Sequence, residues 1–109
     1  MIFGIGTDVV QLQRIERIYE RHGQRFVEHL LLSEEAAAFR DHARPVRFLA
    51  MRFAAKEAIV KAMGTGFQHG MWIRDCGVAA NALGKPEIVW SERGRQRCDE
   101  LGIGEGHIT

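Results

Sequence analysis

The sequence predicts a single α+β domain over residues 1–109, a mixed α/β fold in which a small antiparallel sheet packs against a long central helix. Three observations predict this class. The chain of 109 residues is long enough for one ordinary core. Apolar residues make up 46% and charged residues 27%, which is typical of a globular chain. Segments with strand and helix periodicity follow one another in the order strand, helices, hairpin and helix.

The first third of the chain is predicted to contain one strand and two helices. Residues 2–10 are apolar and rich in β-branched side chains, which favours a strand. Apolar residues at helical spacing predict a helix over residues 11–22, and Gly23 is placed to end it. A second short helix is expected over residues 25–32.

The middle of the chain is predicted to hold two further helices. Ser33, followed by two glutamates, is an N-cap signal for a helix that runs to about Asp41. Pro45 suits the opening of a long helix over residues 46–63, and Gly64 suits its end. This long helix is the predicted centre of the fold.

The last third is predicted to form a hairpin and a final helix. Strands are expected over residues 72–80 and 87–90, joined by a turn at residues 84–86. The serine and glutamate at residues 91–92 mark the start of a helix that Gly102 ends. The remaining residues are expected to be extended.

Composition excludes several classes of function. The formal net charge is +1, so no overall field attracts nucleic acid. No apolar run approaches the ~20 residues of a membrane span, and the start lacks the basic region of a signal peptide. Cys76 and Cys98 are too few and too distant for a disulfide scaffold or a metal knuckle. A reduced, cytoplasmic setting with no membrane or nucleic-acid partner is therefore expected.

Two basic residues stand one turn apart on the long predicted helix. Helical periodicity places Lys56 inside a mainly apolar sector, with Arg52 four residues before it. Such a like-charged pair is mildly destabilising by itself, and an anion between the side chains would reverse the sign. In the alternative interpretation, Lys56 extends along the apolar stripe to solvent and binds nothing.

A neighbouring face of the same helix carries Glu57 and Lys61, also four residues apart. Small residues on this face, Ala50 and Ala54, leave room for a ligand or another backbone. The helix is followed by Gly64-Thr65-Gly66, where glycine permits backbone N–H groups to approach a phosphate. Alternatively, Glu57 and Lys61 form a solvated ion pair that contributes about 0.3 kcal/mol, and the glycine is only a C-cap.

The first predicted strand contains an acid. Alternation places Gly4, Gly6 and Asp8 on one face, and aspartate is depleted in strands. If Asp8 and Glu57 converge, they form a two-carboxylate site that suits Mg²⁺, with other positions left for water and phosphate. The basic residues of the long helix would then indicate phosphoryl chemistry on a diphosphate substrate. The alternative is that Asp8 ends the strand and caps the following helix.

Three motifs together carry a family resemblance: GIGTDVVQLQRIE, RFAAKEAIVKAMGTG and LGKPEIV. They resemble the holo-[acyl-carrier-protein] synthases, the small 4′-phosphopantetheinyl transferases of bacterial fatty acid biosynthesis, in order and spacing over nearly the whole chain. The resemblance implies that family's fold and a homotrimer with active sites between subunits. It also implies Mg²⁺-dependent transfer of 4′-phosphopantetheine from coenzyme A to a serine of apo acyl carrier protein, with release of 3′,5′-ADP.

The resemblance also implies roles for individual residues. Asp8 and Glu57 match the acids that bind Mg²⁺, and Lys61 matches a lysine that contacts the diphosphate. Glu57 and Lys61 are the predicted catalytic residues, and the serine proton passes either to Glu57 or to a water on the metal. The predicted coenzyme A contacts are Arg52, Lys56, Lys61, Gly64, Thr65, Gly66 and His107.

A basic stripe is the predicted docking site for the acidic acyl carrier protein. Its members are Arg14, Arg17 and Arg21, with Arg25 joining them if the first helix extends that far. Arg14 matches a family position that contacts the carrier. The alternative is a solvated face balanced by neighbouring glutamates. Leu12, Ile15 and Ile18 are expected in the core rather than in the docking surface.

The chain departs from the family near its end. Family members continue with a final strand that joins the sheet, whereas His107 to Thr109 match only the first residues of that strand, so the domain is expected to lack it. This departure leaves a second hypothesis, a non-catalytic oligomeric module that binds an acidic partner protein. Release of 3′,5′-ADP from coenzyme A in the presence of apo carrier distinguishes the two. A transferase for a secondary-metabolite carrier is a third hypothesis, which the short chain disfavours.

Overall fold

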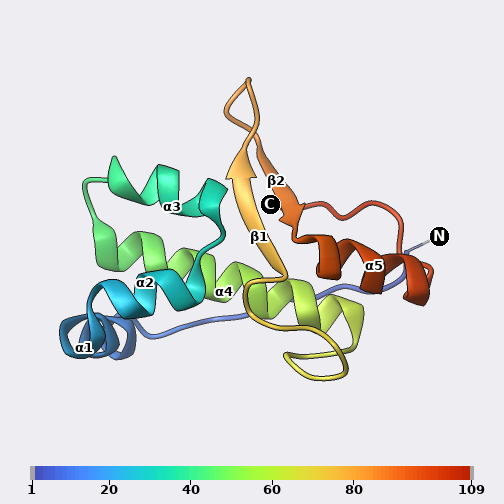
Figure 1. Ribbon diagram of the computed structural model, residues 1–109, viewed down its shortest axis with the longest axis horizontal. Helices are drawn as coiled ribbons and strands as arrows, with labels where there is room; N and C mark the ends of the chain where they lie inside the picture. The colour runs from blue at the N-terminus through green and yellow to red at the C-terminus, as the bar shows by residue number, and fades with distance from the viewer. Residues whose placement is uncertain (1, 109) are drawn as a thin grey trace.

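The computed structural model, which describes residues 2–108, has a long helix at its centre with the other elements around it (Figure 1). The helices are α1 (Leu12–His22), α2 (Gln24–Leu30), α3 (Ser33–Arg40), α4 (Pro45–Met63) and α5 (Glu92–Leu101). The strands are β1 (Cys76–Ala80) and β2 (Pro86–Trp90), which pair in one antiparallel sheet. The predicted α+β class, with a long central helix, is confirmed.

The central helix α4 begins one residue before its predicted start and ends where predicted. Pro45 occupies the first position, where its missing N–H has no intrahelical acceptor to lose. Gly64 ends the helix in a left-handed conformation, with φ of 80°, which glycine adopts more readily than other residues. No glycine or second proline interrupts the helix between these two residues.

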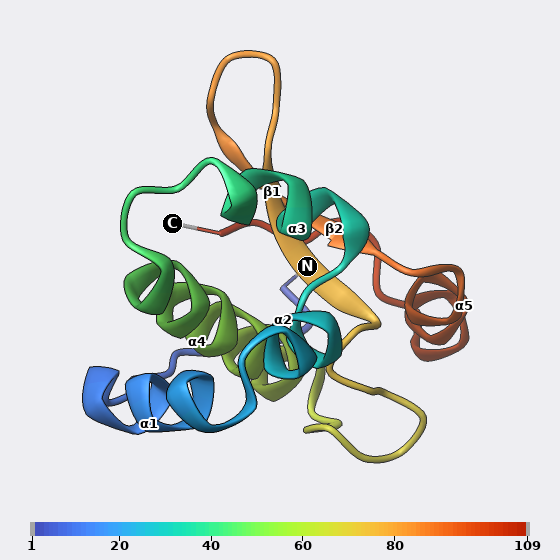
Figure 2. The same cartoon turned by 60° about the vertical axis from the view of Figure 1, so that its left-hand side comes forward.

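Two apolar clusters lie along α4. The first joins its first half to α1 and α2, and its buried residues are Ile15, Val27, Leu30, Leu31, Phe48, Leu49 and Ala50. The second joins its second half to β1 and α5, and its buried residues are Ile59, Val60, Met63, Met71, Cys76, Val78 and Cys98. Each large apolar side chain stabilises the fold by about 1.5–3 kcal/mol when fully buried. The hairpin lies between α3 and α5 in both views (Figures 1 and 2).

The prediction of a sheet strand over residues 2–10 is wrong. The segment is extended, yet it has no β-partner among the described residues and lies along α4 instead (Figure 1). Gly6 packs against Ala58. Gly4 packs one turn further on, against Ala62, so the segment runs antiparallel to the helix. A Cβ at either glycine would overlap a carbonyl oxygen of α4, so this close approach requires glycine.

The hairpin starts later than the prediction of a strand over residues 72–80, because β1 begins at Cys76. Asp75 explains the difference. Its carboxylate accepts the N–H of Trp72 at 2.8 Å, and its own N–H donates to the Trp72 carbonyl at 2.9 Å, which closes a turn. Strand β2 begins one residue earlier than predicted, and the antiparallel register places Cys76 opposite Trp90.

Two serines differ at their helix starts. Ser91 caps α5 as predicted, since its Oγ accepts the N–H of Gly94 at 2.9 Å. Ser33 is the first residue of α3 rather than its N-cap, so that prediction is wrong by one position. The carboxylate of Glu35 turns back to accept the N–H of Leu32 at 3.0 Å and stabilises this helix start.

The end of the described chain is extended, as predicted. Residues 103–108 join no sheet within the described part of the chain, while Ile103 and Ile108 pack against the second cluster. Thr109 lies outside the described residues. No helix within residues 2–108 is both long enough and apolar enough to cross a membrane.

Candidate active site on the central helix

An acid and a lysine from distant parts of the chain meet beside α4. Nζ of Lys61 lies 2.7 Å from Oδ1 of Asp8 and donates to the carbonyl of Thr7 at 3.3 Å. This contact follows from the antiparallel course of residues 2–10, which brings Asp8 to α4 directly after the glycine contacts. Asp8 is mostly buried, whereas Lys61 is about half exposed, so the pair is open to solvent on one side.

Glu57 lies one turn before Lys61, and residues four apart share one face of a helix. Its side chain is half-buried, and it forms neither an ion pair nor a side-chain hydrogen bond with the rest of residues 2–108. The alternative of a Glu57–Lys61 ion pair is therefore wrong for the described residues, because Lys61 pairs with Asp8. The carboxylate of Glu57 is left available to a ligand.

The donor chemistry of this face fits one class of metal ion. Across residues 2–108, no three or more His, Cys, Asp or Glu side chains form a cluster that could hold a metal by themselves. Asp8 and Glu57 each offer carboxylate oxygens alone, a donor type that suits Mg²⁺ and does not suit a structural zinc. Mg²⁺ is commonly held by one or two carboxylates, with water and substrate phosphate in the other positions.

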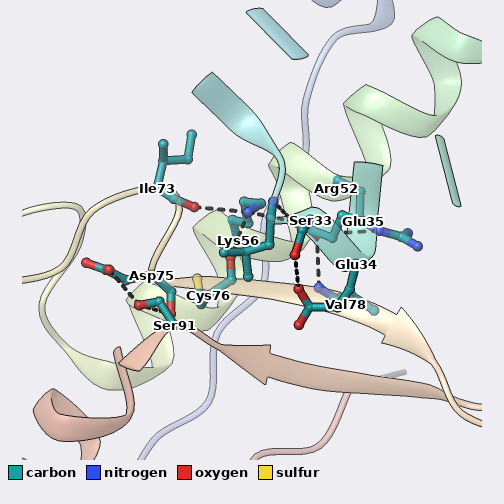
Figure 3. Close-up of polar contacts among 11 residues, drawn as sticks. Ser33, Glu34, Glu35, Arg52, Lys56, Ile73, Asp75, Cys76, Val78 and Ser91 are labelled. Atoms are coloured by element: carbon teal, nitrogen blue, oxygen red, sulfur yellow. Dashed lines mark hydrogen bonds and ion pairs between the residues drawn. The ribbon is translucent and has the colours of Figure 1, made fainter. Parts of the chain in front are cut away.

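Lys56 lies elsewhere than predicted (Figure 3). Its side chain is 0% exposed, and its ammonium pairs with Oε1 of Glu35 at 2.8 Å. The same ammonium donates to the carbonyls of Ile73 at 3.0 Å and Cys76 at 2.6 Å. Three acceptors match the three N–H groups of the ammonium. The prediction that Lys56 contacts coenzyme A is wrong, and so is the alternative that it reaches solvent, because all three donors are used inside the protein.

The anion expected between Arg52 and Lys56 is the protein's own Glu35, which is fully buried. Oε1 of Glu35 pairs with Lys56 and accepts the N–H of Leu32. Oε2 accepts the N–H of Val78 at 3.0 Å and lies 3.6 Å from Nε of Arg52. Glu35 therefore links α3, α4 and β1 at one point.

Arg52 keeps donors that the described residues do not use. Its guanidinium stacks on Phe48, with Cζ 4.4 Å from the ring centre. Burial lowers the pKa of Arg52, and the charge of Glu35 opposes that shift. Nε is buried without a hydrogen-bond partner, and the terminal nitrogens likewise donate to no described residue. This arrangement leaves Arg52 able to receive an external anion.

The N–H groups that follow α4 are used by the helix itself. Gly64 donates to the carbonyl of Lys61 at 3.1 Å. Thr65 and Gly66 both donate to the carbonyl of Val60 at 3.2 Å. The C-cap alternative is confirmed, and the expectation that these N–H groups bind phosphate is wrong, because the last turn already provides their acceptors. It stays a prediction that other atoms of these three residues contact coenzyme A.

The basic stripe is shorter than the sequence allowed. Arg14, Arg17 and Arg21 are exposed on α1, and none of them forms an ion pair with another described residue. Gly23, with φ of 55°, separates α1 from α2, so Arg25 belongs to a different helix. The three arginines of α1 are therefore the basic stripe, and their contact with a carrier protein stays a prediction.

His107 lies apart from the residues described above. It is exposed, and its Nε2 is 3.8 Å from a carboxylate oxygen of Glu105. Its predicted contact with coenzyme A stays a prediction.

Sequence and structure comparisons agree on the family. The family model of the 4′-phosphopantetheinyl transferase superfamily matches residues 4–108. A holo-[acyl-carrier-protein] synthase of Neisseria meningitidis is 46% identical over 103 residues, which cover 94% of this chain and 82% of that protein. A crystal structure of the Neisseria meningitidis enzyme aligns with a TM-score of 0.89 at 44% identity, covering 96% of this chain and 84% of that one.

A relative with a bound ligand aligns as well. It is a holo-(acyl-carrier-protein) synthase of Bacillus anthracis in complex with coenzyme A (3′,5′-ADP). The alignment has a TM-score of 0.72 at 38% identity and covers 84% of this chain and 77% of that one.

The protein is a small α+β domain with a long central helix. This helix carries Glu57 and Lys61 and lies beside Asp8 of the extended segment, a set of residues suited to phosphorylated ligands. The chain belongs to the 4′-phosphopantetheinyl transferase superfamily. The predicted transferase fold is confirmed by the alignment with the Neisseria meningitidis structure.

Sequence reasoning missed the role of Glu35. A glutamate in the first turn of a helix is explained by the helix dipole alone, so nothing local indicated a second role. The available signal was a lysine in the apolar sector of α4, because a buried ammonium requires an anionic partner. That signal predicts a partner but does not identify which of the 14 acidic residues supplies it.

Proposed function

We propose that this chain transfers 4′-phosphopantetheine from coenzyme A to a serine of apo acyl carrier protein, as a cytoplasmic enzyme of fatty acid biosynthesis. The observation that carries the proposal is the contact of Asp8 with Lys61, one helical turn from Glu57, whose carboxylate pairs with no other described residue. The similar proteins support it, since they are holo-[acyl-carrier-protein] synthases and one of them binds coenzyme A.

The reaction forms a bond between the serine oxygen and the β-phosphorus and breaks the bond from that phosphorus to 3′,5′-ADP. Asp8 and Glu57 would hold Mg²⁺, which when bound offsets charge on the diphosphate. The ammonium of Lys61 contacts the diphosphate from the same face. The serine must lose its proton during attack, and Glu57 is the acceptor that this chain itself supplies.

The active site is proposed to lie between copies of the chain in a homotrimer. Arg52 and Lys61 are nine residues apart on α4, so they point to nearly opposite sides of the helix, about 13 Å apart along its axis. The body of the helix therefore separates these two side chains, so one coenzyme A molecule is not expected to contact both residues of the same chain. A site between neighbours resolves this, with Lys61 of one copy at the diphosphate and Arg52 of the next at the ribose phosphate.

Mass spectrometry of apo acyl carrier protein, incubated with this chain, coenzyme A and Mg²⁺, tests the proposal. We expect the carrier to gain the mass of one phosphopantetheine group and the solution to gain 3′,5′-ADP. Carrier binding without a gain in mass would contradict the transferase and favour a non-catalytic binding module.

A substitution tests the metal site directly. We expect Glu57→Gln to reduce transfer at least about 100-fold, because it removes a charged metal ligand and the proton acceptor. The circular dichroism spectrum should be unchanged, since Glu57 has no protein partner within the described residues. Wild-type turnover by a folded Glu57→Gln variant would exclude this assignment.

A further inference from the structure

A buried carboxylate that the proposed reaction does not use lies behind Arg52. Both oxygens of Glu35 are in contact with donors of the protein, two backbone N–H groups and the ammonium of Lys56. Figure 3 shows Glu35 between Lys56 on one side and Arg52 on the other. Burying a charged cluster is costly for stability, so its place in the fold calls for a further explanation.

The geometry around Arg52 gives that explanation. Its Nε lies 3.6 Å from Oε2 of Glu35, an ion pair just beyond hydrogen-bond distance, and its guanidinium lies over the ring of Phe48. Glu35 itself is held by Lys56 at 2.8 Å and by the N–H of Val78 at 3.0 Å, so its carboxylate presents a fixed negative charge to one edge of the guanidinium. These contacts orient the guanidinium and leave its terminal nitrogens without an acceptor among the described residues.

The phosphate that Arg52 serves follows from its place on α4. Lys61, with Asp8 and Glu57, lies on nearly the opposite side of the helix and serves the diphosphate in the proposed reaction. Coenzyme A carries one other phosphate, on the ribose 3′ oxygen. A guanidinium held in one orientation recognises a phosphate better than a mobile one, because less entropy is lost on binding.

We propose that Glu35 is a positioning residue that holds Arg52 on Phe48 in the orientation that receives the 3′-phosphate of coenzyme A. The inference rests on the proposed function. It assigns a role in coenzyme A binding to Glu35 of α3, a residue that acts through Arg52 and does not itself contact the substrate. Glu35 thereby determines selectivity for coenzyme A over 3′-dephospho-coenzyme A.

The test compares Michaelis constants for these two donors in the full chain. Removing Glu35 alone would leave Lys56 buried without its counter-ion, so Glu35→Gln is combined with Lys56→Met, which removes both buried charges together. We expect the KM for coenzyme A to rise about tenfold and the KM for 3′-dephospho-coenzyme A to change less than about twofold. The exposed neighbour Glu34 provides the matched control, and Glu34→Gln should change neither constant.

A second measurement needs no change at Glu35. In the wild-type chain, the side-chain NMR signal of Arg52, assigned with Arg52→Lys, should shift when 3′,5′-ADP is added. It should shift much less with 5′-AMP, which lacks the 3′-phosphate.

The outcomes separate this inference from the proposed function. If the wild-type chain transfers no phosphopantetheine, the proposed function fails. If it does transfer, but the double variant changes both Michaelis constants equally or leaves both unchanged, only the role of Glu35 is excluded. If the Arg52 signal does not shift when 3′,5′-ADP is added, the role of Glu35 is excluded as well. This result holds even if the double variant does not fold.

Discussion

Two lysines on α4 have opposite environments. Lys56 is completely buried, whereas Lys61 is about half exposed. The difference arises from their partners, since Lys56 meets Glu35 and two carbonyls in the interior, and Lys61 meets Asp8 at the surface. Breaking the buried pair by removing one partner is expected to cost about 3–5 kcal/mol, far more than loss of a surface pair.

The thiol of Cys76 gives a prediction at the residue scale. Burial raises the pKa of Cys76 to about 12, from an ordinary value near 9, while the charge of Lys56 opposes the shift. As the pH rises, the thiol of Cys76 therefore loses its proton in the unfolded chain near pH 9, but in the folded chain only near pH 12. The folded state consequently loses stability progressively between about pH 9 and about pH 12, and the contribution of Cys76 is fully present only below about pH 9. The difference in free energy of unfolding between wild type and Cys76→Ala should shrink over this range, measured by urea denaturation. A difference that stays constant would contradict the assigned pKa.

Several predictions belong to single elements, because whole helices and segments place the functional residues. The extended segment 2–10 brings Asp8 to α4, and α1 presents the basic stripe.

The apolar residues of α1 were predicted to lie in the core, and the structure buries only some of them. Ile15 is buried and Ile18 half-buried, whereas Leu12 is 47% exposed, so its predicted place in the core is wrong. Leu12 is the first residue of α1, at the end of the helix that the extended segment enters.

The course of the N-terminal segment is tested with Gly6→Ala. A methyl group there overlaps the carbonyl of Ala58, so the segment must move away from the helix. We expect the free energy of unfolding to fall by about 1–3 kcal/mol, together with a loss of transfer activity, because Asp8 moves with the segment. Gly104→Ala is the matched control, since a Cβ at Gly104 meets no atom within 4 Å and should change stability little. Equal stability of the two variants would contradict the close packing.

The basic stripe on α1 gives a second prediction at the scale of an element. Arg14→Glu replaces attraction of an acidic carrier by repulsion, so the KM for acyl carrier protein should rise about tenfold while the KM for coenzyme A changes little. Arg40→Glu, the same charge reversal at an exposed position of α3, is the control. Equal increases in both Michaelis constants for Arg14→Glu would argue against α1 as the docking helix.

At the scale of the whole molecule, the apolar surface of the N-terminal segment is the main feature. Ile2, Phe3, Ile5 and Val9 are all at least half exposed, and Met51 of α4 is exposed as well. The backbone of residues 2–10 has no backbone hydrogen bonds with the described residues. Exposed apolar side chains, on a segment whose backbone forms no backbone–backbone hydrogen bond with the described residues, favour contact with a second copy of the chain, in agreement with the proposed homotrimer.

Native mass spectrometry tests that assembly. We expect wild type to be mainly trimeric and Val9→Glu to be mainly monomeric, because the substitution places a charge in an apolar interface. Leu83→Glu is the matched control, since Leu83 is also 93% exposed but lies at the hairpin turn. A trimer that tolerates Val9→Glu as well as Leu83→Glu would exclude this segment from the interface.

Much of the fold was predictable because its causes are local. Periodicity located all five helices, and Pro45, Gly64 and the Ser91 cap located helix ends to within a residue. The start of β1 was not predictable, because the turn at Asp75 depends on a side chain bonding to the backbone three residues earlier. Within the candidate site, the sequence indicated Asp8, Glu57 and Lys61 as functional residues, but the pairing of Asp8 with Lys61 was not predicted, since 53 residues separate the two.

The sequence by itself determined the family, the α+β class and the order of the elements, because motifs, caps and periodicity act over short stretches of chain. Only the tertiary structure decided which charges are buried. It placed Glu35 against Lys56 and Arg52, and it directed residues 2–10 along α4 rather than into the sheet. The physical reason is that the environment of a charge depends on packing between distant segments, which local sequence patterns do not specify.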